Sequence, residues 1–263
     1  MKPLDTHLRG SLGTTFQHGL RRVPTRARGA VVRMILRAVP RGARSSVAGR
    51  AAPVLGPDAY LPVLTGALRG ANGSVVFDVG ANAGFLSLLA ARLVGPAGRV
   101  IAFEPSPAAV VYLRRHVALN RALNIEIIDV AVADENGRAR FSSVGPLELG
   151  HLDAEGEVEV ETASLDTLVE DRVIPPPDVV KIDVEGAELS VLRGARAIMQ
   201  ANRPVVVLST HGFDSHEACC SLLRSLGYAV TLLEHSLATT EFDYLGELVA
   251  EPTASAAARL AHS

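Results

Sequence analysis

The sequence predicts a doubly wound α/β fold built on a mostly parallel sheet of seven strands. Short runs of β-branched and apolar residues alternate with stretches of helical periodicity over most of the chain. These runs are apolar throughout, which is typical of strands buried on both faces of a parallel sheet. Strands that alternate with helices in this way favour right-handed crossovers within one open sheet.

The alternation begins at about residue 58. Six runs are expected to form strands: residues 75–80, 99–103, 125–132, 178–184, 204–210 and 228–234. Four stretches with apolar residues at helical spacing are expected to form helices: residues 84–94, 107–119, 187–200 and 215–226. Residues 246–252 are expected to add a last antiparallel strand, and residues 137–163 to form an insertion with two extended segments.

Composition divides the chain into three parts. Residues 1–57 contain eleven Lys or Arg against one acid, whereas the remainder contains 15 basic and 27 acidic residues. This basic leader is expected to be partly ordered, to form an amphipathic helix that rests on a membrane or a partner, or to be a transit peptide. The α/β domain is expected over residues 58–252, and a flexible tail over residues 253–263.

Composition also narrows the classes of partner and the location. The acidic main part of the chain and an aromatic content of 4% with no Trp argue against nucleic acid as a partner. The chain has no run of 18 apolar residues and no secretory signal pattern. The adjacent Cys219 and Cys220 are not expected to form a disulfide. We therefore expect a cytoplasmic location.

The most informative motif is DVGANAGFLSL, residues 78–88, which joins the first strand to the first helix. Gly80 and Gly84 permit a tight turn, and the helix N-terminus that follows attracts anionic groups. A dinucleotide-binding loop needs glycine at its first, third and sixth positions, but here Asn82 is third and a phenylalanine sixth. The loop therefore suits a smaller zwitterionic ligand, and Asp78 is expected to orient a water or the ammonium of that ligand.

Acidic residues end the next two predicted strands. Glu104, within FEPSP, stands where a carboxylate accepts hydrogen bonds from a ribose diol. Asp129, Val130 and Ala131 end the third strand, where the adenine of a bound nucleoside would lie. Asp129 is expected to accept a hydrogen bond from the adenine amino group, and a main-chain N–H to serve a ring nitrogen.

Further polar residues follow the fourth and fifth strands. Lys181, Asp183 and Glu185 alternate along the chain, and Asp183 stands at the ligand-binding edge of an open α/β sheet. His211 lies at the same edge, where an imidazole can act as a general base. Three roles fit this cluster: positioning a cofactor, taking a proton from an acceptor, or holding a divalent cation. We assign no metal ligand, and both helix capping and catalysis are open for Glu188.

These motifs, in this order, resemble those of the FkbM-type family of methyltransferases. The resemblance spans about residues 74–235 and is carried by DVGANAG (78–84), FEPSP (103–107), ALN (118–120), AVADENG (131–137), SLDTL (164–168), KIDVEGAEL (181–189) and RP–VVVLSTHG (203–212). It implies a Rossmann-like class I methyltransferase fold and S-adenosylmethionine as methyl donor. It also implies O-methylation of a hydroxyl on a sugar, a glycolipid or a natural product.

The resemblance also implies roles for particular residues. Donor contacts map onto Asp78, Gly80, Asn82, Gly84, Glu104 and residues 129–131, and the carboxyl-edge motif maps onto Asp183 and Glu185. Many members carry an acid two residues before the histidine, where this chain has Ser209. We expect His211 or Asp183 to take the proton of the acceptor hydroxyl, with Glu185 as the third catalytic residue. The alternative is a non-catalytic nucleoside-binding scaffold or sensor, which would not need this cluster.

Overall fold

The computed structural model describes residue 68 and residues 72–143, 150–153, 155–236 and 245–253. The expected basic leader, residues 1–57, lies outside the described residues, as does all but Thr253 of the expected tail. Within the described ranges, no helix is both long and apolar enough to cross a membrane.

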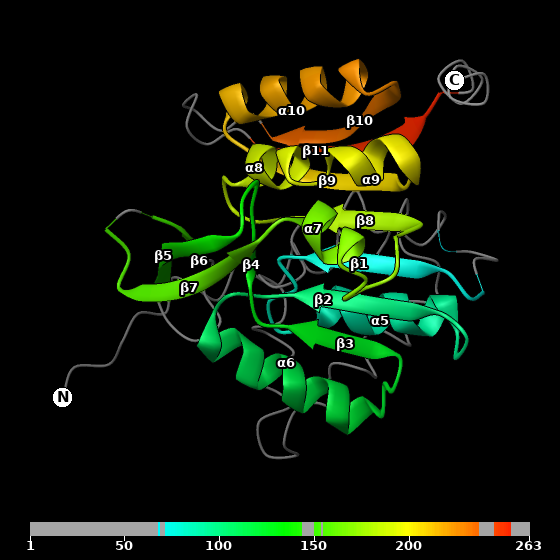
Figure 1. Ribbon diagram of the computed structural model, residues 1–263, viewed down its shortest axis with the longest axis vertical. Coiled ribbons are helices and arrows are strands. Elements are labelled where there is room, and N and C mark those ends of the chain that lie inside the picture. The colour runs from blue at the N-terminus through cyan, green and yellow to red at the C-terminus, as the bar shows by residue number, and fades with distance from the viewer. Residues whose placement is uncertain (1–67, 69–71, 144–149, 154, 237–244, 254–263) are drawn as a thin grey trace, which may run out of the picture. The chain divides into compact units, whose positions relative to one another are not determined.

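A seven-stranded sheet with the strand order β10-β11-β9-β8-β1-β2-β3 forms the centre of the domain (Figure 1). The strands β3, β2, β1, β8 and β9 pair in parallel, whereas β11 pairs antiparallel with both β9 and β10. This confirms the doubly wound, mostly parallel sheet and its last antiparallel strand. The bounds are β1 (Val75–Val79), β2 (Arg99–Phe103), β3 (Ile125–Ile128), β8 (Val179–Ile182), β9 (Val205–His211), β10 (Tyr228–Ser236) and β11 (Leu245–Pro252).

Helices pack against the sheet and bury its apolar residues. The larger core contains Phe77, Ile101 and Val180 from the sheet, together with side chains of α7, α8, α9 and α10. A smaller core joins Ala102 of β2 to Leu113 of α6. The helices are α5 (Phe85–Val94), α6 (Pro107–Asn120), α7 (Leu165–Glu170), α8 (Glu188–Arg193), α9 (Arg196–Ala201) and α10 (Phe213–Ser225).

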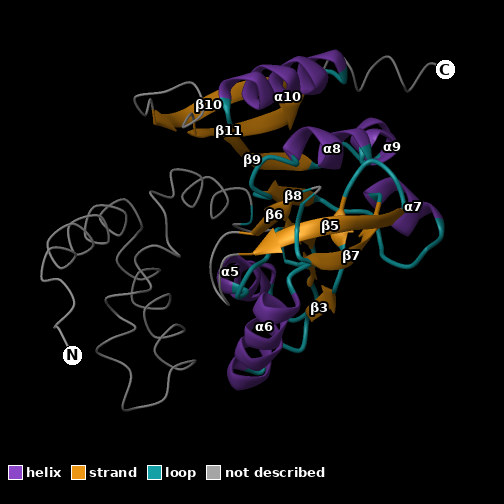
Figure 2. Cartoon of the chain, turned by 90° about the vertical axis from the view of Figure 1, so that its left-hand side faces the viewer, coloured by secondary structure: helices purple, strands orange, loops and turns teal. Residues whose placement is uncertain are grey.

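A second sheet of four strands, with the order β4-β7-β5-β6, corrects two expectations (Figure 1; β5, β6 and β7 are also labelled in Figure 2). Residues 125–132 form two strands instead of one, because the chain leaves the main sheet after β3 and continues as β4 (Ala131–Val132). The insertion holds three strands instead of two: β5 (Gly137–Ser143), β6 (Gly150–Leu152) and β7 (Val158–Ala163). Together these strands bury a small core around Phe141, which two isolated extended segments would leave in water.

The structure also corrects the helix expected over residues 187–200, which is divided into α8 and α9. The carboxylate of Asp166 explains the division, since it accepts hydrogen bonds from the amides of Ala197 and Ile198, both at 2.9 Å. A side chain that satisfies these amides starts a new helix at that point. Asp166 itself belongs to α7, a helix that the apolar periodicity did not predict.

Candidate functional site

The loop between β1 and α5 is shaped by backbone contacts with the neighbouring strands. Gly80 and Asn82 both have positive φ, 75° and 47°. The amides of Gly80 and Ala81 donate to the carbonyl oxygen of Phe103 at 3.1 and 2.9 Å, which ties the loop to the end of β2. A Cβ atom on Gly80 would overlap the carbonyl oxygen of Asp183. Glycine is therefore required at residue 80 both for its φ and for the close approach of β8.

We expect Gly80→Ala to lower the free energy of unfolding by about 2–4 kcal/mol, because it combines positive-φ strain with overlap in a packed region. Chemical denaturation measures the change. Gly73→Ala is the control, since Gly73 also has positive φ but no atom within 4 Å of an added Cβ. A smaller loss of unfolding free energy for Gly80→Ala than for Gly73→Ala would contradict the close contact with Asp183.

No side chain caps the N-terminus of α5. Gly84 is the N-cap residue, with φ 85°. The amides of the first turn therefore lack a side-chain acceptor, and the helix dipole favours a negative group there. This is the kind of site that binds a carboxylate.

Glu104 links the end of β2 to this loop. Its carboxylate accepts hydrogen bonds from the amides of Asn82, at 2.8 Å, and Ser106, at 2.9 Å. Burial raises the pKa of Glu104, against the effect of these two amides. A carboxylate has about four lone-pair positions, so two remain for a ligand. Glu104 is thus held beside the loop, and its binding to a ribose stays a prediction.

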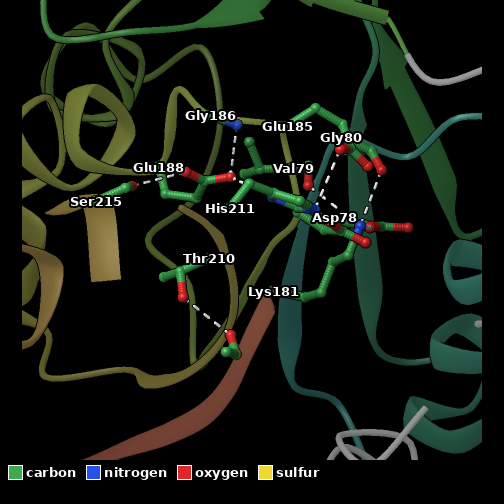
Figure 3. A network of polar contacts seen from close by, with 12 residues as sticks. Asp78, Val79, Gly80, Lys181, Glu185, Gly186, Glu188, Thr210, His211 and Ser215 are labelled. Carbon is green, nitrogen blue, oxygen red and sulfur yellow. Dashed lines mark hydrogen bonds and ion pairs between the residues drawn. The ribbon is translucent and has the colours of Figure 1, made fainter. Parts of the chain in front are cut away.

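Asp78 lies beneath the loop in a buried ion pair. Its side chain accepts a hydrogen bond from Ser87 and lies 3.0 Å from Nζ of Lys181, and both Asp78 and Lys181 are almost completely buried. The ammonium of Lys181 also donates to the carbonyl oxygens of Val79, at 3.2 Å, and Gly80, at 2.8 Å (Figure 3). Burial acts to lower the pKa of Lys181, but the carboxylates of Asp78 and Asp183 outweigh it and raise the pKa. This pair supports the loop from within the protein.

The turn after β3 places the three residues expected near adenine. The exposed Asp129 forms an ion pair with Arg114 of α6, whose Nη2 donates to both carboxylate oxygens at 2.7 and 2.8 Å. Val130 is half-buried, and Ala131 is buried in β4, in register with Thr162. The carboxylate of Asp129 therefore already has a protein partner on α6.

The residues at the ends of β8 and β9 meet around His211 (Figure 3). Nδ1 of His211 lies 2.8 Å from the carboxylate of Glu188, and Nε2 lies 3.1 Å from Glu185 and 3.9 Å from Asp183. Glu188 is fully buried and accepts further hydrogen bonds from the amide of Gly186, at 2.8 Å, and the hydroxyl of Ser215, at 3.1 Å. The structure thus brings together the three predicted catalytic residues and adds Glu188.

Burial and opposite charge set the protonation of this cluster. Burial raises the pKa values of Asp183 and Glu185. Lys181 and His211 only partly compensate for this at Asp183, and His211 does so at Glu185. Burial acts in the same direction on Glu188, but the hydrogen bonds from His211 and Gly186 outweigh it and lower the pKa of Glu188. Burial acts to lower the pKa of His211, whereas Glu188 and Glu185 raise it above its usual value. His211 and Glu188 therefore stabilise each other's charged forms.

Asp183, Glu185 and His211 are also close enough to share a cation, because one ligand atom from each lies within 4.8 Å of the others. Both ring nitrogens of His211 face carboxylates, however, so a protonated imidazole accounts for the same proximity. His151 of β6 also acts to lower the pKa of Glu185.

Sequence reasoning left two functional features of this region unresolved. The sequence left both helix capping and catalysis open for Glu188, because its partner His211 is 23 residues away. The sequence indicated that Lys181 would need a partner if it were buried, but it did not identify that partner. The partner, Asp78, lies on another strand, 103 residues earlier. The sequence pattern that could have indicated this ion pair is the apolar run around Lys181. A lysine in such a run is expected to be buried, and a buried ammonium requires a carboxylate nearby.

The fold and the site define an α/β protein that presents its candidate ligand-binding groups at the carboxyl edge of a doubly wound sheet. The chain belongs to the FkbM methyltransferase family, because the model of the methyltransferase FkbM domain matches residues 78–230.

Three proteins illustrate the similarity. Hexuronic acid methyltransferase AglP of Haloferax volcanii is 33% identical over 143 residues, which cover 53% of this chain and 57% of that protein. The 31-O-demethyl-FK506 methyltransferase FkbM of Streptomyces tacrolimicus is 30% identical over 193 residues, covering 60% of this chain and 74% of that protein. The crystal structure of methyltransferase FkbM from Methylobacillus flagellatus KT aligns with a TM-score of 0.49 at 18% identity, covering 89% of this chain and 58% of that one.

Proposed function

We propose that this protein is an S-adenosylmethionine-dependent O-methyltransferase. The observation that carries the proposal is the pairing of Glu104 with the loop before the uncapped helix α5. This pair lies beside the switch point of the sheet, between β1 and β8, where open α/β sheets bind their ligands. It offers a carboxylate for a ribose and a positive helix end for an amino-acid carboxylate, which are two parts of S-adenosylmethionine.

The remaining donor contacts follow from the same edge of the sheet. When bound, the donor supplies a methyl group already activated on a sulfonium. Asp129 accepts a hydrogen bond from the adenine amino group, in competition with Arg114, and the main chain at Val130 or Ala131 serves a ring nitrogen. Asp78 was expected to orient a water or the ammonium of the donor. Because it is buried and paired with Lys181, its proposed role is instead indirect: the ion pair holds the loop that contacts the methionine part.

The acceptor is proposed to be a hydroxyl of a sugar, a glycolipid or a natural product. The printed names of two relatives support a sugar hydroxyl: a hexuronic acid methyltransferase, and the 2-O-methyltransferase NoeI of Sinorhizobium fredii, which is 27% identical over 155 residues. A hydroxyl loses its proton as it is methylated, so the site needs a base. Asp183, Glu185 and His211 form that basic cluster, and His211 or Asp183 takes the proton.

Calorimetric titration with S-adenosylhomocysteine tests the donor site. Micromolar binding of S-adenosylhomocysteine is expected, with no binding of NADH. Glu104→Ala should weaken the binding of S-adenosylhomocysteine by about 10- to 150-fold, because a hydrogen bond to a charged group contributes about 1.5–3 kcal/mol. Glu126→Ala is the control, since Glu126 is an acid of the same sheet that pairs with Arg99 at the surface.

Failure to bind S-adenosylhomocysteine, or equal binding of NADH, would refute the proposed donor site. Binding without methyl transfer to any hydroxyl in a panel of sugars and glycosides would instead favour a nucleoside-binding scaffold or sensor. The cluster around His211 argues for the enzyme, since a sensor does not need a base beside its ligand.

A further inference from the structure

Glu188 is the most completely enclosed acid of the described residues, with an exposed fraction of 0%. It lies behind His211, and its carboxylate accepts hydrogen bonds from the amide of Gly186 and the hydroxyl of Ser215, with Nδ1 of His211 at 2.8 Å. These two donors favour the ionised form of the buried carboxylate, and an ionised carboxylate only accepts hydrogen bonds. Nδ1 of His211 therefore carries a proton.

We propose that Glu188 is a positioning residue that fixes the tautomer of His211 and so makes Nε2 the base for the acceptor hydroxyl. The inference rests on the proposed methyl transfer and decides between His211 and Asp183 as the base. With the proton held on Nδ1, the neutral ring has its lone pair on Nε2. Nε2 faces Asp183 and Glu185, which follow β8, and the side chains of all three residues are partly exposed.

The proton transfer is balanced in charge. As the acceptor oxygen bonds to the methyl carbon, the carbon–sulfur bond breaks and its electron pair stays on sulfur, which becomes neutral. The O–H proton moves to Nε2, and the imidazolium that forms lies 2.8 Å from the carboxylate of Glu188. The proton then leaves to solvent. Glu188 stays ionised throughout and does not touch the acceptor, so its effect is exerted through His211.

The charges around His211 predict the pH dependence. Glu188 of α8 faces Nδ1, and Asp183 and Glu185 face Nε2; His151 of β6 acts on Glu185, and Lys181 acts on Asp183. The three carboxylates raise the pKa of His211, so the base is protonated and inactive below that pKa. The ratio kcat/KM is expected to rise with pH through the raised pKa. Removal of the charge on Glu188 should move this rise to lower pH.

The experiment compares Glu188→Gln with Glu217→Gln, the same change at an exposed position of α10. For Glu188→Gln, kcat should fall by about 10- to 100-fold, since misorientation forfeits part of a base's contribution. Affinity for S-adenosylhomocysteine should stay within about twofold, and the rise of kcat/KM should shift to lower pH. Glu217→Gln should match the parent chain in all three measurements.

A second measurement needs neither an acceptor nor a stable variant. Long-range 1H–15N NMR of the parent chain, titrated with pH, should show the neutral ring of His211 protonated on Nδ1.

A neutral ring protonated on Nε2 would overturn the inference, as would Glu188→Gln with unchanged kcat and an unshifted pH profile. Activity lost in EDTA and restored by Mg²⁺ or Mn²⁺ would also overturn it, because Nε2 would then be a metal ligand. Failure of the proposed function would appear separately, as absent binding of S-adenosylhomocysteine.

Discussion

Replacing His211 by alanine is expected to lower kcat for methyl transfer by about 10²- to 10⁴-fold, the usual contribution of a positioned general base. Affinity for S-adenosylhomocysteine should stay within about twofold, because the proposed donor residues belong to β1, the loop after it, the end of β2 and the turn after β3. Single-turnover transfer of labelled methyl groups measures the first quantity, and calorimetry the second. The combination of lost transfer and retained binding separates a base from a residue that supports the fold.

Asp183→Ala tests the alternative base in the same assay. Asp171→Ala is the control, because Asp171 is an exposed aspartate at the end of α7. If His211 is the base, Asp183→Ala should reduce kcat less than His211→Ala does. Full activity in both His211→Ala and Asp183→Ala would remove this cluster from the mechanism.

Replacing Lys181 by methionine is expected to lower the free energy of unfolding by about 3–5 kcal/mol. The reason is that Asp78, with 2% of its surface exposed, would be left as a buried carboxylate without its cation. The carbonyl oxygens of Val79 and Gly80 would lose a donor at the same time, so affinity for S-adenosylhomocysteine should fall as well. Chemical denaturation gives the stability, and calorimetry the affinity.

Two further variants make this prediction specific. Arg99→Met breaks a surface ion pair with Glu126 and should cost no more than about 1 kcal/mol. The double variant Asp78→Leu with Lys181→Met should be more stable than Lys181→Met alone, because no unpaired charge remains in the interior. A loss for Lys181→Met as small as that for Arg99→Met would show that the buried pair does not support the loop.

Local patterns predicted much of the fold. Apolar runs located the parallel strands, and helical spacing located α5, α6 and α10, since both patterns depend on residues a few positions apart. The same approach was wrong at residues 125–132 and 187–200. In each case the boundary depends on a partner far away in the sequence: Thr162 of β7 for β4, and Asp166 of α7 for α9.

By itself, the sequence determined the order of the elements, the glycine loop, the acid at the end of β2 and the edge of the sheet that carries the site. These features follow from neighbouring residues, because parallel strands place their carboxyl ends together. Only the tertiary structure decided that Lys181 pairs with Asp78 and that Glu188 lies behind His211. Such pairs form between side chains that folding brings out of water together, and burial makes each charge require the other.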